Sequence, residues 1–347
     1  MFSKNLRYHR LLNGLTMREL ADRVGLTSMA ISNYEKGTRN PDRETLSKLA
    51  EVFNIRIVDL LTPRNDKLLF VHGQFRKNTR LGRSKQDLIH ESIEEYFSRF
   101  YNIIEILGEA NLPAVPACNI GQLSEDVEEN ARELRLWLNL GPEGPVPNLV
   151  DAVENKGILI FSKEINDRDF SGINGSVNGR PYIAVNRNMN PERQRFTIAH
   201  ELAHLYFSWS PENECEKVSN AIADAFLFPR NDALRELGIR RTGIYRDMEL
   251  TAKEYGISML CLAYRARELK IVSEEAYRRF MKRASQMGWQ VNEPSRINPE
   301  ETRLFRQLVF RAVSEGEVSV QKGAELLQVS YQEVHEACFG EGAYAIN

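Results

Sequence analysis

The stretch RFTIAHELAHLYF, residues 195–207, decides how this chain is organised. Its apolar residues recur at three- and four-residue spacing, which predicts an amphipathic helix. His200 and His204 are four positions apart, so a helix places both imidazoles on one face, about one turn apart. Glu201 lies beside them. The stretch therefore predicts a helix that presents two imidazoles and a carboxylate together.

This spacing is the HExxH pattern of zinc hydrolases, in which the histidines bind the metal and the glutamate is the general base. A catalytic zinc also needs a third protein ligand and one open position for water. The next predicted helix, ECEKVSNAIADAFLF at residues 214–228, offers Glu216, with Glu212 and Glu214 as nearby rivals. The expected cofactor is Zn²⁺, and a zinc ion that only stabilises the fold is the alternative.

The surroundings of the motif, residues 121–270, have mixed α/β character. GILIF at 157–161 and PYIAVN at 181–186 are predicted strands, separated by a Gly/Asn-rich turn region. Pro191 opens the motif helix, and Pro229 ends the helix that follows. These elements predict a small sheet beside two helices.

The N-terminal part, from about residue 5 to 61, is predicted to be a string of short helices. Thr16 can cap the second helix, Gly25 breaks it, and Thr27 or Ser28 can cap the third. The turn Val24-Gly25-Leu26 separates a small Ala21 from an apolar Ile31. This is the spacing that a helix-turn-helix requires.

Charge supports a nucleic-acid site in the same part of the chain. Residues 1–64 hold eleven basic and seven acidic residues, a balance of +4, whereas the whole chain has a net charge of −2. A local basic patch is the electrostatic footprint of DNA binding. The alternative is a small helical domain used only for protein contact.

Cysteine usage and hydropathy indicate the compartment. The four cysteines are widely spaced, with no CxxC pair, which fits a reducing cytosol and argues against a disulfide scaffold. The first residues, MFSKNLRYHR, contain no apolar run of the kind found in signal peptides. No stretch approaches the ~18 apolar residues of a membrane span. We expect a cytoplasmic protein with no membrane partner.

The stretch ELADRVGLTSMAISNYEKGTRNPDRETLSKLAEVF, residues 19–53, resembles the Xre/Cro-type repressor family. The resemblance implies that the third helix enters the major groove of a double-stranded DNA operator, with the protein as a homodimer. Met17 stands where the family usually has a polar residue, which puts one backbone contact in doubt. The implied DNA-binding residues are Thr27, Ser28, Met29, Ser32, Asn33, Lys36 and Arg39.

Three further segments resemble the ImmA/IrrE-family metallopeptidases, in the family's order: NLVDAVENKGILIF, PYIAVNRNMNPERQRFTIAHELAHLYF and EKVSNAIADAFLFP. In that family the third ligand is the glutamate thirteen residues before the closing proline, which is Glu216 here. The resemblance implies that His200, His204 and Glu216 are the zinc ligands and that Glu201 is the catalytic base. Phe228 replaces the usual methionine before the proline, a mild departure.

The predicted fold class is α+β and mostly helical, in four parts. Residues 1–64 form a five-helix helix-turn-helix domain, and 65–120 a helical linker. Residues 121–275 form a zincin-like peptidase domain with a small sheet. Residues 276–347 form a helical, helix-turn-helix-like C-terminal segment. The acidic character of that last segment favours docking against the zinc domain over DNA contact.

Together these features predict a DNA-binding transcriptional regulator with a zinc-dependent endopeptidase domain. Its protein substrate is expected to be a helix-turn-helix repressor or the chain itself, in a stress, mobile-element or phage response. Peptidase activity that depends on a signal is compatible with this reading. The alternative is a non-proteolytic repressor or antitoxin whose zinc domain binds a partner toxin or a signal. A third hypothesis is that the N-terminal domain only recognises a related repressor.

Overall fold

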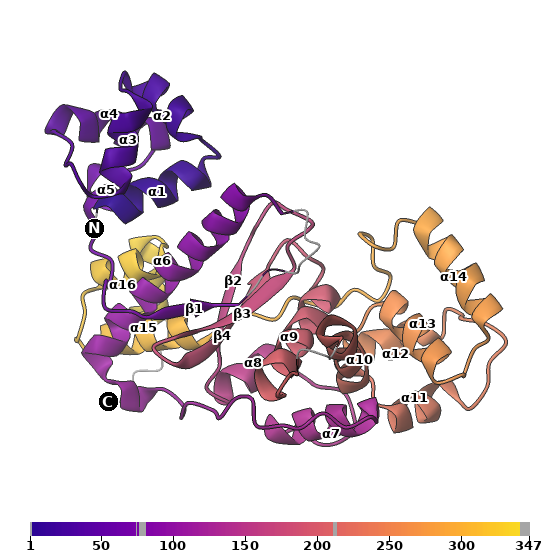
Figure 1. Cartoon of the computed structure of the whole chain (residues 1–347). Helices are drawn as coiled ribbons and strands as arrows, with labels where there is room; N and C mark the ends of the chain where they lie inside the picture. Colours follow the sequence, from indigo (N-terminus) through magenta and orange to yellow (C-terminus); the bar gives the residue numbers. More distant parts are fainter. Residues whose placement is uncertain (1, 74, 76–80, 211–213, 341–347) are drawn as a thin grey trace. The chain divides into compact units, whose positions relative to one another are not determined.

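The computed structural model describes residues 2–73, 75, 81–210 and 214–340. The chain is mostly helical with a four-stranded sheet of order β1-β3-β4-β2, which confirms the predicted fold class (Figure 1). Among the described residues, no helix combines the length and apolar character that a membrane span needs. The chain divides into two compact units, residues 1–70, 75–111 and 305–347 in one and residues 71–74 and 112–304 in the other.

The first unit is entirely helical apart from its connections. Its helices are α1 (Phe2–Leu12), α2 (Met17–Val24), α3 (Ser28–Glu35), α4 (Arg43–Phe53), α5 (Ile57–Leu61), α6 (Arg83–Leu107), the 3-10 helix η1 (Glu109–Asn111), α15 (Leu304–Ser314), α16 (Val320–Leu327) and α17 (Tyr331–Phe339).

The N-terminal helices begin and end where the sequence predicts. Thr16 and Glu19 form a capping box at the start of α2, and Gly25 ends that helix with φ 72°. Thr27 caps α3 by accepting a hydrogen bond from the amide of Ala30 at 3.2 Å. The core between these helices holds fully buried apolar side chains, among them Leu6, Leu20, Ile31 and Leu49.

A buried ion pair joins α1 to α3. Arg10 Nε donates to Glu35 Oε1 at 2.5 Å, and Arg10 Nη2 donates to Glu35 Oε2 at 2.9 Å. Arg10 Nη1 also donates to the carbonyl of Leu15 at 2.9 Å. The side chains of Arg10 and Glu35 are only 8% and 4% exposed. This pair ties the third helix to the rest of the N-terminal bundle.

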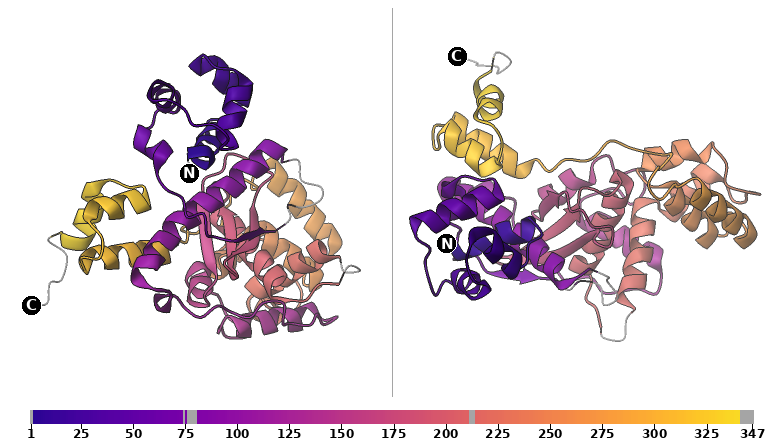
Figure 2. Two further views of the ribbon diagram at one scale, coloured as in Figure 1. Left: turned by 60° about the vertical axis from the view of Figure 1, so that its left-hand side comes forward. Right: turned by 90° about the horizontal axis from the view of Figure 1, so that it is seen from above.

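The C-terminal helices α16 and α17, drawn in yellow in Figure 2, are capped in the same way as α2 and α3. Ser319 and Ser330 cap them, as Thr16 and Thr27 cap the earlier pair. Gln328, with φ 57°, takes the place of Gly25. These caps and the left-handed residue between the helices agree with the rhythm of the sequence, and the helix-turn-helix-like character of the segment stays a prediction. The segment packs in the first unit, where α16 contacts α6, a partner that the sequence did not suggest.

The second unit surrounds the sheet with helices. Its elements are β1 (Phe70–His72), α7 (Val127–Trp137), α8 (Leu149–Asn155), β2 (Leu159–Lys163), β3 (Gly172–Val177), β4 (Arg180–Asn186), α9 (Pro191–Tyr206), α10 (Cys215–Leu227), α11 (Arg230–Leu237), α12 (Met248–Tyr255), α13 (Met259–Glu268) and α14 (Glu274–Gln286), with Phe70 itself in the first unit.

Two strands lie where the sequence predicts none. The presumed turn region between the two predicted strands contains β3, which pairs antiparallel with β4, while β2 pairs parallel with β4. The segment predicted as a helical linker contributes β1 as well as α6. Glycine and asparagine are depleted in strands, so the residue types of β3 do not predict a strand. Pairing with β4 decides its conformation.

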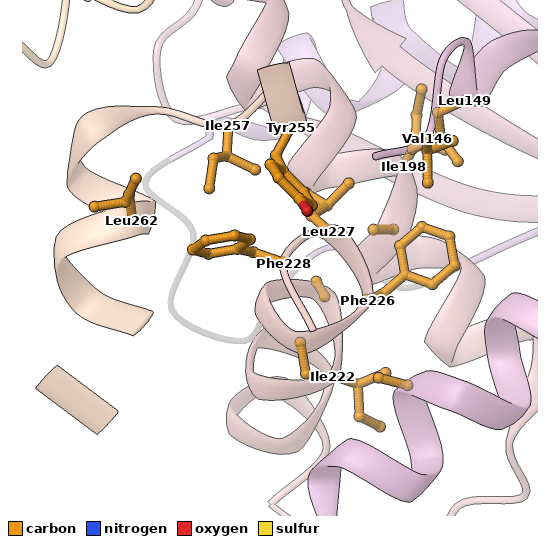
Figure 3. Close-up of a cluster of buried hydrophobic side chains, with 14 of the residues drawn as sticks. Val146, Leu149, Ile198, Ile222, Phe226, Leu227, Phe228, Tyr255, Ile257 and Leu262 are labelled. Atoms are coloured by element: carbon orange, nitrogen blue, oxygen red, sulfur yellow. The ribbon is translucent and has the colours of Figure 1, made fainter. Parts of the chain in front are cut away.

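The core of this unit fixes α9 and α10 against the sheet. Ile183 of β4, Leu202 of α9 and Ile222 of α10 are fully buried in one apolar cluster. Figure 3 shows Phe226, Phe228 and neighbouring residues in part of that cluster, and the Phe228 and Tyr255 ring centroids are 4.7 Å apart. Because both helices are held along their lengths, the side chains between them are well positioned.

We expect Glu35→Ala to destabilise the N-terminal bundle by about 3 kcal/mol, because the Arg10 guanidinium stays buried without its carboxylate partner. The double variant Arg10→Met/Glu35→Leu should recover most of that loss. Native-state hydrogen exchange of the α2 and α3 amides in the full chain measures both. Wild-type exchange rates in Glu35→Ala, or equal rates in the single and double variants, would contradict a cost from the unpaired Arg10 charge.

Candidate metal centre

Helices α9 and α10 bring three metal-binding side chains together. His200 and His204 lie one turn apart on α9, and Glu216 lies in the first turn of α10. The two Nε2 atoms are 3.1 Å apart. Glu216 Oε2 is 3.6 Å from His200 Nε2, and Glu216 Oε1 is 3.5 Å from His204 Nε2. Among the described residues, these three side chains form a cluster that could hold a metal ion.

The size of this triangle suits a zinc ion. Zinc–ligand distances of about 2.0–2.2 Å around a tetrahedral ion separate neighbouring donor atoms by about 3.3 Å. The two imidazole nitrogens are 3.1 Å apart, and each lies 3.5–3.6 Å from a different oxygen of the Glu216 carboxylate, so all three separations are close to that value. Two imidazole nitrogens and one carboxylate also leave the fourth position of a tetrahedron open. The residues present therefore fit a catalytic type of metal site.

The site is buried on the α9 side and open on the α10 side. The side chain of His200 is 1% exposed, that of His204 18% and that of Glu216 52%. The Trp209 ring packs on His204 with centroids 5.3 Å apart, and the Phe196 ring stacks on His200 at 6.5 Å. These rings pack on the imidazoles, whereas the Glu216 side chain is exposed.

Glu201 is held by a residue that the sequence did not single out. Asn174 of β3 donates from Nδ2 to Glu201 Oε2 at 2.7 Å. Glu201 is buried, with 7% of its surface exposed. A side-chain amide thus orients the carboxylate that lies beside the metal-binding triangle. The sequence carried no signal for this contact, because Asn174 falls in a segment that reads as a turn.

The other acidic residues near Glu216 do not join the cluster. Glu214 is exposed, and its carboxylate lies 3.0 Å from the Lys217 ammonium. Glu212 lies outside the described residues. Of the rivals left open by spacing, the structure thus places Glu216 with the histidines. Its role as a ligand stays a prediction.

Asp224, two turns further along α10, faces a different neighbour. It accepts a hydrogen bond from Cys261 Sγ at 3.1 Å. Burial raises the pKa of Asp224 to about 7, and burial also raises the pKa of the Cys261 thiol. This pair belongs to the packing between α10 and α13, and the described metal-binding cluster does not include it.

The predicted DNA-binding residues gather on α3 and the loop after it. Ser28 and Met29 in its first turn are exposed, Ser32 and Asn33 are half-buried, and Lys36 and Arg39 beyond its end are exposed. The Thr27 hydroxyl serves as the helix cap. The structure thus brings the predicted residues to one helix, and their individual base or phosphate contacts stay predictions.

Two family models match the chain. The helix-turn-helix model matches residues 6–60. The M78 peptidase model, described as the IrrE N-terminal-like domain, matches residues 153–267 and so spans α9, α10 and the metal-binding triangle.

Curated relatives match the N-terminal part. An uncharacterized helix-turn-helix regulator of Archaeoglobus fulgidus is 40% identical over 63 residues, which cover 18% of this chain and 90% of that protein. The regulators YqaE and ImmR of Bacillus subtilis are 34% and 36% identical over 70 and 92 residues. These matches cover 20% and 26% of this chain, but only 60% and 61% of the two regulators. The chain therefore belongs to the helix-turn-helix family through its N-terminal helices, and its residues 153–267 match the IrrE N-terminal-like peptidase domain.

Proposed function

We propose that this protein is a DNA-binding transcriptional regulator whose second unit is a zinc-dependent endopeptidase. Its substrate is a regulatory protein, either a helix-turn-helix repressor or the chain itself, cut in a stress, mobile-element or phage response. The observation that carries the proposal is the triangle of His200, His204 and Glu216, with Glu201 oriented beside it by Asn174.

His200, His204 and Glu216 would hold the zinc ion. Two imidazoles and one carboxylate are a donor set found in catalytic zinc sites, whereas magnesium and calcium prefer oxygen ligands alone. A bound zinc ion supplies two things, a bound water with its pKa lowered toward ~7 and polarisation of the peptide carbonyl.

Glu201 would move the proton. Its carboxylate accepts a proton from the attacking water and then donates it to the nitrogen of the leaving amine, so the carboxylate is regenerated after each cycle. The hydrogen bond from Asn174 Nδ2 to Glu201 Oε2 limits rotation of the carboxylate and keeps it aimed at the water position. The buried setting of Glu201 excludes competing bulk water.

The N-terminal helices would bind an operator. Asn33 suits a bidentate contact to adenine, and Ser28 and Ser32 can hydrogen-bond several bases. Lys36 and Arg39 are exposed where a phosphate backbone would pass, and they belong to the part of the chain with a balance of +4. A homodimer would match the two-fold symmetry of a palindromic operator.

Metal analysis tests the ligand assignment. Glu216→Gln should lose most of its zinc on dialysis, because a neutral carboxamide is a much weaker ligand than a carboxylate. Glu214→Gln is the matched control, since Glu214 is exposed and pairs with Lys217 outside the cluster. Both variants and the wild type are compared by mass spectrometry of bound metal. Equal zinc retention in both variants would remove Glu216 from the ligand set.

Proteolysis tests the role of Glu201. Glu201→Gln should keep zinc and DNA binding but lower the cleavage rate by at least about 10²-fold, the usual scale of general-base catalysis. Asn174→Ala should retain zinc and lose part of the rate. Cleavage of a candidate helix-turn-helix repressor, and of the chain itself, is followed by gel and mass spectrometry.

Two outcomes of this assay would count against the peptidase. If Glu201→Gln cut at the wild-type rate, the assigned mechanism would be wrong. If zinc-loaded wild-type protein cut neither substrate, the non-proteolytic hypothesis, with a zinc domain that binds a toxin or signal, would replace it.

Salt-dependent binding tests the DNA reader. Lys36→Ala should weaken binding to the protein's own promoter and to unrelated DNA by the same factor, since one phosphate contact is lost. The slope of log affinity against log salt concentration should fall in magnitude by about 0.9. Asn33→Ala should instead relax the preference at one base pair. Fluorescence anisotropy across a salt series measures both effects. If the wild type did not bind the promoter even at low salt, the proposal that the N-terminal helices bind an operator would be ruled out.

A further inference from the structure

Strand β1 occupies the edge of the sheet next to β3, the strand that orients Glu201 (Figure 1). The amide of Gly73, directly after β1, donates to the carbonyl oxygen of Asn174 at 2.8 Å. The side chain of the same Asn174 donates to Glu201 at 2.7 Å. Asn174 therefore contacts both the segment Val71–Gly73 at the sheet edge and the Glu201 carboxylate.

Two glycines allow this segment to lie so close to β3. A Cβ atom at position 73 would lie 2.5 Å from the carbonyl oxygen of Asn174. A Cβ atom at position 175 would lie 2.5 Å from the carbonyl oxygen of Val71. Neither Gly73 nor Gly175 has a positive φ, so backbone conformation does not require glycine there. The close approach of the two strands does.

The segment is also recognised through a side chain. His72 Nδ1 lies 2.6 Å from the hydroxyl oxygen of Tyr182 on β4, although β3 lies between the two strands. Tyr182 is in register with Gly175, and a side chain at 175 would collide with the Tyr182 hydroxyl. The imidazole therefore reaches across β3 through the space that Gly175 leaves empty.

We propose that the edge of β3 is a docking edge for an extended peptide, and that Val71–Gly73 is its tethered resident occupant. The peptide class that fits is an extended segment with a hydrogen-bonding side chain such as histidine, followed by glycine. Strand addition to a sheet edge supplies backbone hydrogen bonds, and the Tyr182 contact supplies selectivity. The consequence for catalysis rests on the proposed peptidase function: a docked segment lies against the residue that orients Glu201.

The resident segment has the features of a displaceable strand. It is short, and Val71 is 68% exposed. Few buried contacts and exposed backbone hydrogen bonds are typical of segments that open locally. Because the segment is part of the chain, its effective concentration at the edge is on the order of millimolar. An added peptide therefore binds well only after the resident strand has been released.

The test uses the full-length, zinc-loaded protein and a fluorescein-labelled peptide of residues 67–73, KLLFVHG, with an amidated end. Gly73→Ala places a methyl group against the Asn174 carbonyl, and Gly73→Pro also removes the amide that donates to it. The matched control is Gly82→Ala, where a Cβ atom meets nothing within 4 Å. Faster hydrogen exchange of the Val71 amide in both variants, and of the amide at position 73 in Gly73→Ala, shows that the strand is released.

The released variants should bind the peptide at least about tenfold more tightly than the wild type or Gly82→Ala, because the self-occupied state no longer competes. A peptide with alanine in place of histidine should bind more weakly. Released variants that bind no better than the control would overturn the proposal. A strand that stays protected in both Gly73 variants would overturn it too, because β1 would then be a permanent cover for the edge.

Cleavage of the candidate repressor, measured in parallel, separates this inference from the peptidase proposal. Tighter peptide binding without cleavage by any variant would leave the docking edge standing and remove the peptidase. Equal cleavage by the wild type and Gly73→Ala, without peptide binding, would leave the peptidase standing and remove the docking edge. If both proposals hold, Gly73→Ala should cut faster than Gly82→Ala.

Discussion

The packing of α9 against α10 is the constraint on which the metal centre depends. A helix alone can align His200 with His204, but Glu216 is on another helix, and its distance from the imidazoles is set by how closely the two helices approach. Ala199, Ala203 and Ala223 are fully buried, and such small side chains permit close helix packing. A large residue at one of these positions would separate the donor atoms without touching any of them.

The sheet has a second role beyond supporting α9. Through Asn174, strand β3 reaches the carboxylate that the HExxH pattern assigns to proton transfer. Through its backbone, the same residue binds the segment after β1. The chemistry and the proposed peptide edge thus share a single asparagine. Such an arrangement would let an event at the sheet edge change the orientation of Glu201 without moving His200, His204 or Glu216.

The helix pair α2 and α3 and the helix pair α16 and α17 share a capping geometry but differ in the side chains that they carry. Both place a left-handed residue between two hydroxyl-capped helices. The first belongs to a part of the chain with an excess of basic residues. In the second, the exposed helix carries Tyr331, His335 and Phe339 in a row of ring contacts, with acidic neighbours. Shared backbone geometry therefore does not imply shared DNA binding.

Short-range rules in the sequence determined the helices, their caps and the histidine pair, because these depend on residues within a few positions of one another. Thr16, Gly25 and the spacing from His200 to His204 are examples. Strand β3 escaped prediction because glycine and asparagine disfavour strands, and β1 because it has only three residues. Both depend on pairing within the sheet, β1 with β3 and β3 with β4. The resemblance singled out Glu216, but its distance from the histidines, the contact from Asn174 to Glu201 and the position of Gly73 beside β3 were decided by tertiary structure. Each joins residues on different elements, and local sequence does not encode the distances between them.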